Sequence, residues 1–151
     1  SSFISRSGRV ATMADKNQIS HNLSDFPFHY ELQTRWKDMD AFGHVNNAVF
    51  LSYIEDARIT FFKRWNLCDE KRSIIMASAK IDYLRQIDHP SHLIVGERIS
   101  RIGRKSFDIE SAVFIKDEAD AVATSIVTCV CYDYKQNESV PVYPEIIEDF
   151  K

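Results

Sequence analysis

The chain of 151 residues has the composition of an ordinary globular domain, with 44% hydrophobic and 27% charged residues and a formal net charge of −3 at pH 7. This composition excludes a mostly disordered chain, and the negative charge without a basic stripe argues against a nucleic-acid partner. No apolar run approaches the roughly 20 residues that cross a bilayer, so we expect a cytoplasmic protein without a membrane span.

The beginning of the chain differs in composition from the rest. Residues 1–12 are rich in serine, contain two arginines and no acidic residue, and precede Met13. We expect residues 1–25 to be a flexible tail, of which the first twelve residues are either native or an expression scar. Residues 26–151 are expected to form a single domain, because no linker or internal repeat divides them.

The cysteines and histidines do not have the spacing of a metal site. Cys129 and Cys131 lie two residues apart in a strand-like pattern, and Cys68 stands alone. His89 and His92 bracket a proline turn with no third ligand in view. We therefore expect reduced cysteines that pack in the interior, and no metal.

The first predicted elements are a strand and a long helix. Large and polar residues alternate over residues 30–36, which predicts a half-buried strand, and a segment rich in Asp, Gly and Asn then ends it. Over residues 47–65 the spacing of the large apolar residues changes to four, three, four and four, which places them on one stripe of a helix. The stripe comprises Phe50, Ile54, Ala57, Phe61 and Trp65.

The rest of the chain predicts a mostly antiparallel sheet. Short turns at residues 102–105 and 117–120 favour hairpins, since parallel strands need longer crossovers. One long strand is apolar on both faces, as expected if the helix covers one face and something else, such as a second subunit, covers the other. A short helical tail follows at residues 145–150. The strands are expected at residues 74–84, 93–102, 107–115 and 121–134.

A compact motif joins the first strand to the helix. It consists of Asp38-Met39-Asp40 followed by Gly43-His44-Val45-Asn46-Asn47, so that a carboxylate and an imidazole four residues apart precede the helix. The first turn of a helix has unpaired N–H groups and the positive end of the helix dipole, which can hold developing negative charge. This is the layout of a hydrolytic site.

Strand, motif, long helix and antiparallel strands together resemble the hotdog-fold thioesterases of the 4-hydroxybenzoyl-CoA thioesterase type. The resemblance extends over about residues 28–135. Its further markers are Tyr53-Ile54-Glu55-Asp56-Ala57-Arg58, Asp82-Tyr83-Leu84-Arg85 and Arg101-Ile102-Gly103-Arg104-Lys105-Ser106.

The resemblance implies both a fold and an activity. The fold is α+β, a five-stranded antiparallel sheet wrapped around the helix at residues 47–65, in a homodimer or homotetramer that binds the acyl thioester between subunits. The activity is that of an acyl-CoA thioesterase, which releases a free acid and coenzyme A. Coenzyme A is then part of the substrate, and no separate cofactor is expected.

The resemblance also implies roles for the residues of the motif. Asp40 is expected to be the catalytic carboxylate, as general base or nucleophile, and Asp38 a structural one. The structural alternative is that Asp40 only bonds N–H groups of its own turn. His44 either polarises the thioester carbonyl or the attacking water, or merely lines the site. A backbone N–H near Asn47 is expected to bind the thioester oxygen, with Asn46 and Asn47 setting the start of the helix.

Glu55 is the second candidate for the catalytic carboxylate. It lies three residues before Arg58, and the alternative role for Glu55 is a salt bridge with that arginine. We expect Arg58 to be partly buried and to need such a partner.

Other residues are candidates for contacts with the substrate. The cations and the hydroxyl at strand ends could meet the phosphates of coenzyme A, although charged turn residues are usually only solvated. The predicted substrate-binding residues are Phe42, Gly43, Phe50, Arg85, Arg104, Lys105 and Ser106. Two other functions stay open: a non-catalytic module that binds acyl thioesters, and a thioesterase acting on acyl carrier protein.

Overall fold

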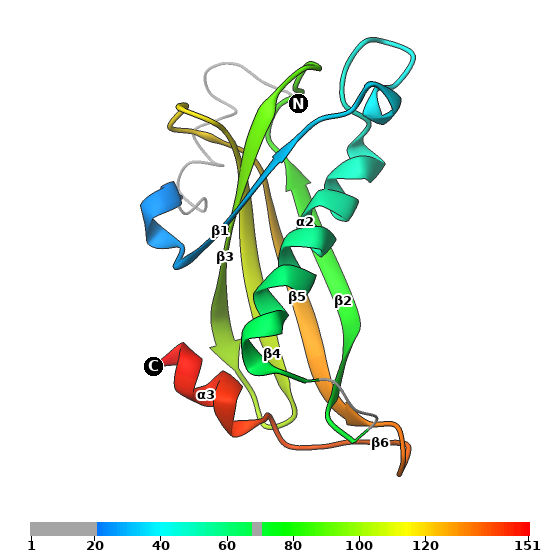
Figure 1. Ribbon diagram of the computed structural model, residues 1–151, viewed down its shortest axis with the longest axis vertical. Coiled ribbons are helices and arrows are strands. Elements are labelled where there is room, and N and C mark those ends of the chain that lie inside the picture. Colours follow the sequence, from blue (N-terminus) through cyan, green and yellow to red (C-terminus); the bar gives the residue numbers. More distant parts are fainter. Residues whose placement is uncertain (1–20, 68–70) are drawn as a thin grey trace, which may run out of the picture.

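The computed structural model describes residues 21–67 and 71–151 and shows a curled sheet wrapped around one long helix (Figure 1). Cys68 and most of the predicted tail at residues 1–25 lie outside the described residues. The last three residues of that stretch form the 3-10 helix η2 (Leu23–Asp25).

All strand pairs are antiparallel, and the strands follow the order β1-β3-β4-β5-β2, with β6 beside β5. The α+β fold and the antiparallel sheet are thus confirmed, and a two-residue strand is added to the five predicted. The strands are β1 (Phe28–Gln33), β2 (Ser73–Tyr83), β3 (His92–Ile102), β4 (Ser106–Ile115), β5 (Ala121–Asp133) and β6 (Glu138–Ser139). The α-helices are α2 (Asn47–Phe62) and α3 (Pro144–Phe150), and the other 3-10 helices are η3 (Trp36–Asp38) and η4 (Lys63–Trp65).

The sheet has two distinct ends. At one end, residues 84–91 connect β2 to β3, and the backbone of His44 bridges that of Asp88, so the motif also lies at this end. At the other end, residues 103–105 close the β3–β4 hairpin, near α3 (Figure 1). The eleven residues of β3 separate the two ends by about 33 Å, at roughly 3.3 Å per residue.

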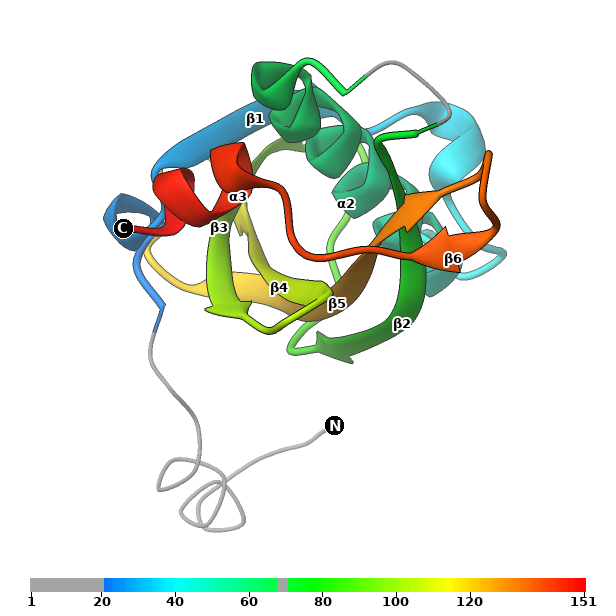
Figure 2. The same ribbon diagram turned by 90° about the horizontal axis from the view of Figure 1, so that it is seen from below.

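Helix α2 lies in the concave face of the sheet, as the end-on view shows (Figure 2). All five residues of the predicted stripe are buried. Two apolar clusters result. The cluster near the motif joins Phe50 and Ile54 to Leu93 and Val95, and the cluster near α3 joins Phe61 to partners that include Trp65 and Phe107.

A polar layer separates these two clusters. Glu97, Ser111 and Ser125 occupy paired positions on β3, β4 and β5 and are buried, as is Arg58 on α2. The Ser111 hydroxyl donates to Glu97 Oε2 at 2.7 Å, whereas Glu97 Oε1 and Ser125 Oγ have no partner among the described residues. Such a layer costs stability, because buried polar groups without a hydrogen bond lose their hydration.

Two predicted boundaries were wrong. The first strand ends at Gln33 and not at residue 36, because the Asp38 carboxylate accepts a hydrogen bond from the Arg35 amide and draws the chain into η3. Trp36 is consequently 77% exposed. The α-helix ends at Phe62 and continues to Trp65 only as η4, which Asn66 stops with its left-handed conformation, φ 54°.

Other predictions are confirmed. Cys129 and Cys131 are free and buried, and the short C-terminal helix is present as α3. Arg58 is buried and lies 3.6 Å from Glu55, the expected partner. None of the helices in the two described ranges has the length and the apolar character needed to span a membrane.

Candidate active site

Residues 38–46 form a closed turn directly before α2. The Asp40 amide donates to the His44 carbonyl oxygen at 2.7 Å, and the Asn46 amide donates to the Asp38 carbonyl oxygen at 2.8 Å. Gly43 has a φ of 85°, which a residue without a side chain adopts easily. The turn therefore leads directly from Asp40 to the residue that caps α2.

The Asp40 carboxylate has one fixed and one free oxygen. Its Oδ1 accepts hydrogen bonds from the amides of Phe42, at 2.8 Å, and His44, at 3.1 Å. These two bonds, that of His44 first, hold the pKa of Asp40 below its usual value. No described residue donates to Oδ2. The structural role weighed for Asp40 is thus present, and it leaves one oxygen of an ionised carboxylate available for chemistry.

The first turn of α2 has one uncommitted amide. The Asn46 side chain caps the helix by accepting from the Ala48 amide at 3.0 Å, as predicted, and the Asn46 carbonyl oxygen accepts from the Val49 amide at 2.9 Å. The Asn47 amide has no acceptor among the described residues. This amide is a candidate donor to an oxyanion.

His44 lies in the turn and faces the loop that precedes β3. Its Nε2 is 3.7 Å from Asp88 Oδ1, and its Nδ1 is buried with no partner among the described residues. The adjacent Val45 amide donates to the Ile87 carbonyl oxygen at 2.9 Å. The sequence did not point to Asp88, because nothing in its spacing indicates that residues 84–91 fold back onto the motif.

Asp38 is the buried carboxylate of the motif, only 2% exposed. The Tyr53 hydroxyl donates to its Oδ2 at 2.6 Å, and the Arg35 guanidinium reaches both of its oxygens. Burial opposes ionisation of Asp38, but these hydrogen bonds outweigh it and keep its pKa below the usual value. The structural role predicted for Asp38 agrees with this geometry, whereas the part played by Tyr53 was missed.

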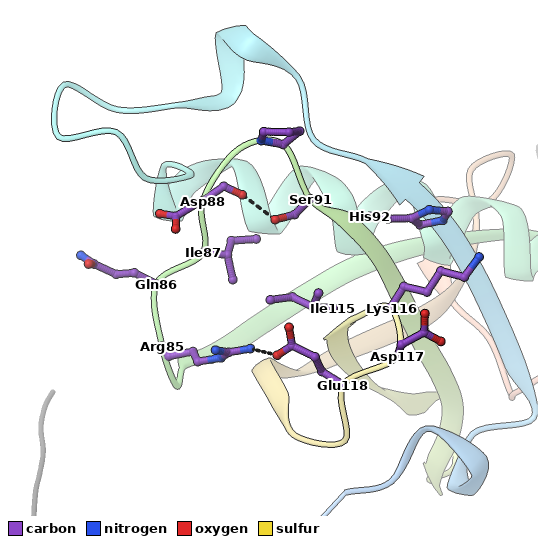
Figure 3. A pocket seen from close by; sticks show the side chains of 11 residues that line it. Arg85, Gln86, Ile87, Asp88, Ser91, His92, Ile115, Lys116, Asp117 and Glu118 are labelled. Atoms are coloured by element: carbon purple, nitrogen blue, oxygen red, sulfur yellow. Dashed lines mark hydrogen bonds and ion pairs between the residues drawn. The ribbon is translucent and has the colours of Figure 1, made fainter.

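A groove of about 590 Å³ lies beside the motif, between the loop after β2, the start of β3 and the β4–β5 hairpin (Figure 3). Its two cations, Arg85 and Lys116, and its imidazole, His92, already have carboxylate partners. Arg85 pairs with Glu118, and Glu31 accepts from His92 at 2.8 Å and lies 4.0 Å from Lys116. A phosphate could bind Arg85 here only by displacing an acidic side chain.

The other predicted substrate-binding residues are dispersed in one chain. Phe42 is 85% exposed at the tip of the turn, next to Gly43, whereas Phe50 is buried against the rings of Tyr53 and Tyr83. Glu55, the second candidate carboxylate, is exposed on α2.

The β3–β4 hairpin carries the remaining predicted contacts with coenzyme A. Arg104, Lys105 and Ser106 lie there, at the end of the sheet opposite Asp40, and Ser106 Oγ accepts from Arg101 at 3.0 Å. One chain does not bring these residues to the motif. Within residues 21–67 and 71–151, no group of three or more His, Cys, Asp or Glu side chains could hold a metal ion. The absence of a cofactor stays a prediction.

A curled antiparallel sheet around one long helix, with an aspartate-containing turn directly before that helix, defines the class of the hotdog-fold thioesterases. The Thioesterase-like superfamily matches residues 34–150, and the chain belongs to this superfamily of thioester hydrolases.

The chain is also similar to solved and curated proteins, two of which are named thioesterases. A thioesterase from Thermus thermophilus, solved in complex with coenzyme A and Zn, is 33% identical, with a TM-score of 0.72 over 83% of this chain and 98% of that chain. The Bacillus subtilis protein YsmA is 32% identical over 88 residues, which cover 57% of this chain and 60% of YsmA. The Escherichia coli long-chain acyl-CoA thioesterase FadM is 23% identical over 123 residues, or 78% of this chain and 92% of FadM.

Proposed function

We propose that the protein hydrolyses an acyl-CoA to a free acid and coenzyme A, with Asp40 as the reacting carboxylate. The observation that carries the proposal is that the two oxygens of this carboxylate differ in their hydrogen bonds. Two backbone amides fix Oδ1, whereas neither Oδ2 nor the amide of Asn47, at the start of the adjacent helix, has a partner within residues 21–67 and 71–151. A base or nucleophile thus lies close in the chain to a donor for the oxyanion.

As a general base, Asp40 takes a proton from water while the water oxygen attacks the thioester carbon. The carbonyl oxygen becomes an oxyanion that the Asn47 amide stabilises. When the carbon–sulfur bond breaks, the thiolate of coenzyme A leaves and takes up the proton. As a nucleophile, Asp40 forms a mixed anhydride and releases the thiolate first, and water then hydrolyses the anhydride. His44 polarises the water or the carbonyl in either case.

The names of two relatives support coenzyme A as the carrier. FadM is called a long-chain acyl-CoA thioesterase, and the Thermus thermophilus protein was solved with coenzyme A. Arg104 and Lys105 lie at the end of the sheet opposite the motif, and only a second copy could bring them toward it. Their position supports assembly as a homodimer or homotetramer. The long edge strand β2, mostly exposed, is the natural place for two sheets to join.

A panel of acyl-CoAs with aliphatic and aromatic acyl groups tests the proposal, with free thiol as the readout. Wild type is expected to hydrolyse some members, and Asp40→Asn to lose at least about a hundredfold in kcat, the usual cost of removing an acid–base group. Asp120→Asn, in the exposed β4–β5 turn, is the matched control and should retain wild-type kcat. A parallel loss in His44→Ala would support the paired role.

Other outcomes separate the alternatives. Unchanged turnover in Asp40→Asn would eliminate the role of this residue and direct attention to Glu55. Tight binding of acyl-CoA without turnover by wild type would favour a non-catalytic binding module. Turnover of acyl carrier protein thioesters alone would replace coenzyme A as the carrier.

A further inference from the structure

Tyr53 makes an unusual contact for a residue in an apolar stripe. It lies on the buried face of α2, where its ring contacts Phe50, and its hydroxyl donates to Asp38 Oδ2 at 2.6 Å. Burial, followed by the hydrogen bond to Asp38, raises the pKa of Tyr53 far above its usual value. The hydroxyl therefore keeps its proton and remains a donor at neutral pH.

This contact connects two parts of the chain that must be aligned for the proposed reaction. Asp38 begins the turn that carries Asp40, and Tyr53 lies seven residues beyond the helix cap, about 10 Å along α2. Among the described residues it is the only side chain of α2 that hydrogen-bonds to residues 34–45. Without it, the described part of the chain would hold the turn to α2 only through the backbone at Asn46 and the apolar packing of Val45 against the helix.

The Asp38 carboxylate also organises the backbone before the turn. Its Oδ2 accepts from the Arg35 amide at 2.9 Å and its Oδ1 from Arg35 Nη2 at 3.0 Å, while the Asp38 carbonyl oxygen accepts from the Asn46 amide. A displaced Asp38 would therefore move both the entry and the exit of the turn. The amides of Phe42 and His44, which fix Asp40 Oδ1, lie within that turn.

We propose that Tyr53 is a positioning residue that acts through Asp38 to hold the Asp40 turn in register with the first turn of α2. The role in catalysis rests on the proposed thioester hydrolysis, and the positioning itself does not. Tyr53 does not contact the reacting atoms. Its contribution is the fixed relation between the carboxylate and the Asn47 amide, since small displacements of reacting groups cost large factors in rate.

The decisive variant is Tyr53→Phe, which removes only the hydroxyl. We expect kcat to fall about tenfold while KM changes less than about twofold, because the alignment matters most in the transition state. We also expect the midpoint of the Asp40 titration to rise, because the loosened turn weakens the amide bonds to Oδ1. NMR measures this midpoint from the pH dependence of the Phe42 and His44 amide resonances, without any turnover.

Tyr143→Phe is the matched control. Its hydroxyl bond is part-buried, whereas that of Tyr53 is buried, and the hydroxyl donates to a backbone oxygen, that of Ser73 at 2.8 Å, at the α3 end of the protein. Thermal unfolding of both variants gives the loss of stability that a lost tyrosine hydroxyl causes by itself. The proposal is supported if only Tyr53→Phe changes kcat and the Asp40 midpoint.

The proposal is overturned if Tyr53→Phe matches Tyr143→Phe in kcat and leaves the Asp40 midpoint at its wild-type value. A wild type that hydrolyses no acyl thioester would refute the proposed function, but the NMR titration would still decide the positioning role. The two failures are therefore distinguishable.

Discussion

The two ends of α2 are built differently. The C-terminal end is closed by aromatic rings, with Phe61 stacked on Phe28 at 5.0 Å between ring centroids and next to Trp65 at 5.4 Å. One charged side chain of α3 completes it, because Asp149 accepts hydrogen bonds from both Arg64 and Trp65. The N-terminal end carries the exposed Phe42, together with an amide and a carboxylate oxygen that have no partner in the part of the chain that the structure describes.

The C-terminal, closed end of α2 thus contributes mainly to stability, and the N-terminal, open end mainly to the proposed chemistry. Groups at the closed end already have partners and cannot bind anything else without losing them. The amide and the carboxylate oxygen at the open end have no partner among the described residues, which leaves them free to meet a substrate. Substitutions at the closed end should therefore lower the free energy of unfolding, and those at the open end should lower the reaction rate.

The largest expected effect is that of Phe61→Ala. The buried ring leaves a cavity among aromatic neighbours, and we expect the free energy of unfolding to fall by about 3–5 kcal/mol. Chemical denaturation measures this loss, and kcat per folded molecule should remain near the wild-type value. Phe42→Ala at the open end is the reverse case, with less than about 0.5 kcal/mol lost and a raised KM. A strongly destabilised Phe42→Ala would contradict the division between the two ends.

Glu97→Gln tests the polar layer between the two ends. Burial raises the pKa of Glu97 to about 8, from 4.5 for an exposed carboxyl, although the nearby charge of Arg58 and the Ser111 hydroxyl act against the rise. Between these values the unfolded chain has released the proton and the folded chain keeps it, so the stability of wild type falls as the pH rises. Glu97→Gln lacks this pH-dependent loss. Its free energy of unfolding should therefore rise by roughly 4 kcal/mol relative to that of wild type as the pH increases from 4.5 to 8.

Denaturant titrations at several pH values give the free energy of unfolding at each pH. The difference between the two proteins appears in the slope of this free energy against pH. Glu138→Gln, an exposed substitution in β6, is the control and should keep the wild-type slope. Parallel slopes for wild type and Glu97→Gln would show that Glu97 is already ionised in the folded state.

Gly43→Ala tests the turn at the open end. The φ of 85° is strained for alanine, yet among the described residues no atom beyond the two chain neighbours of Gly43 lies within 4 Å of an added Cβ, so the cost is conformational. We expect a loss of about 1–2 kcal/mol, the cost of a left-handed conformation. Because this strain acts within the turn that fixes Asp40, kcat should fall as well. Gly43→Asn should lose less of both, since asparagine tolerates positive φ, and equal losses in the two variants would indicate another cause.

The periodicities of the sequence predict the fold closely. The apolar stripe of α2 and the hairpin turns depend on local spacing, which the packed structure keeps. The end of β1 was misplaced because the Asp38 side chain competes with the sheet for the Arg35 backbone, and alternation does not reveal such a contact. The motif drew attention to Asp40, whose proposed role the amides of its own turn support.

Long-range pairing is what the sequence could not provide. Tyr53 has the spacing of a core residue, and only the folded chain brings its hydroxyl to Asp38. Asp88 reaches His44 through a loop that spacing does not place. Arg104 and Lys105 stand at a strand end as predicted, but the antiparallel order puts that end opposite the motif, so their proposed contact with coenzyme A requires a second copy.

The smallest expected effect is that of Asp149→Asn at the closed end. The amide oxygen can still accept from Trp65 Nε1, which lies 2.7 Å from the carboxylate, so the variant loses mainly the charge that faces Arg64 at 3.2 Å. Because both partners are partly exposed, we expect a loss under about 1 kcal/mol, with kcat unchanged. Screening should reduce the difference from wild type further in about 0.5 M salt. A loss of rate in this variant, measured with the same acyl-CoA, would mean that the two ends of α2 are coupled and that stability and chemistry are not separated along it.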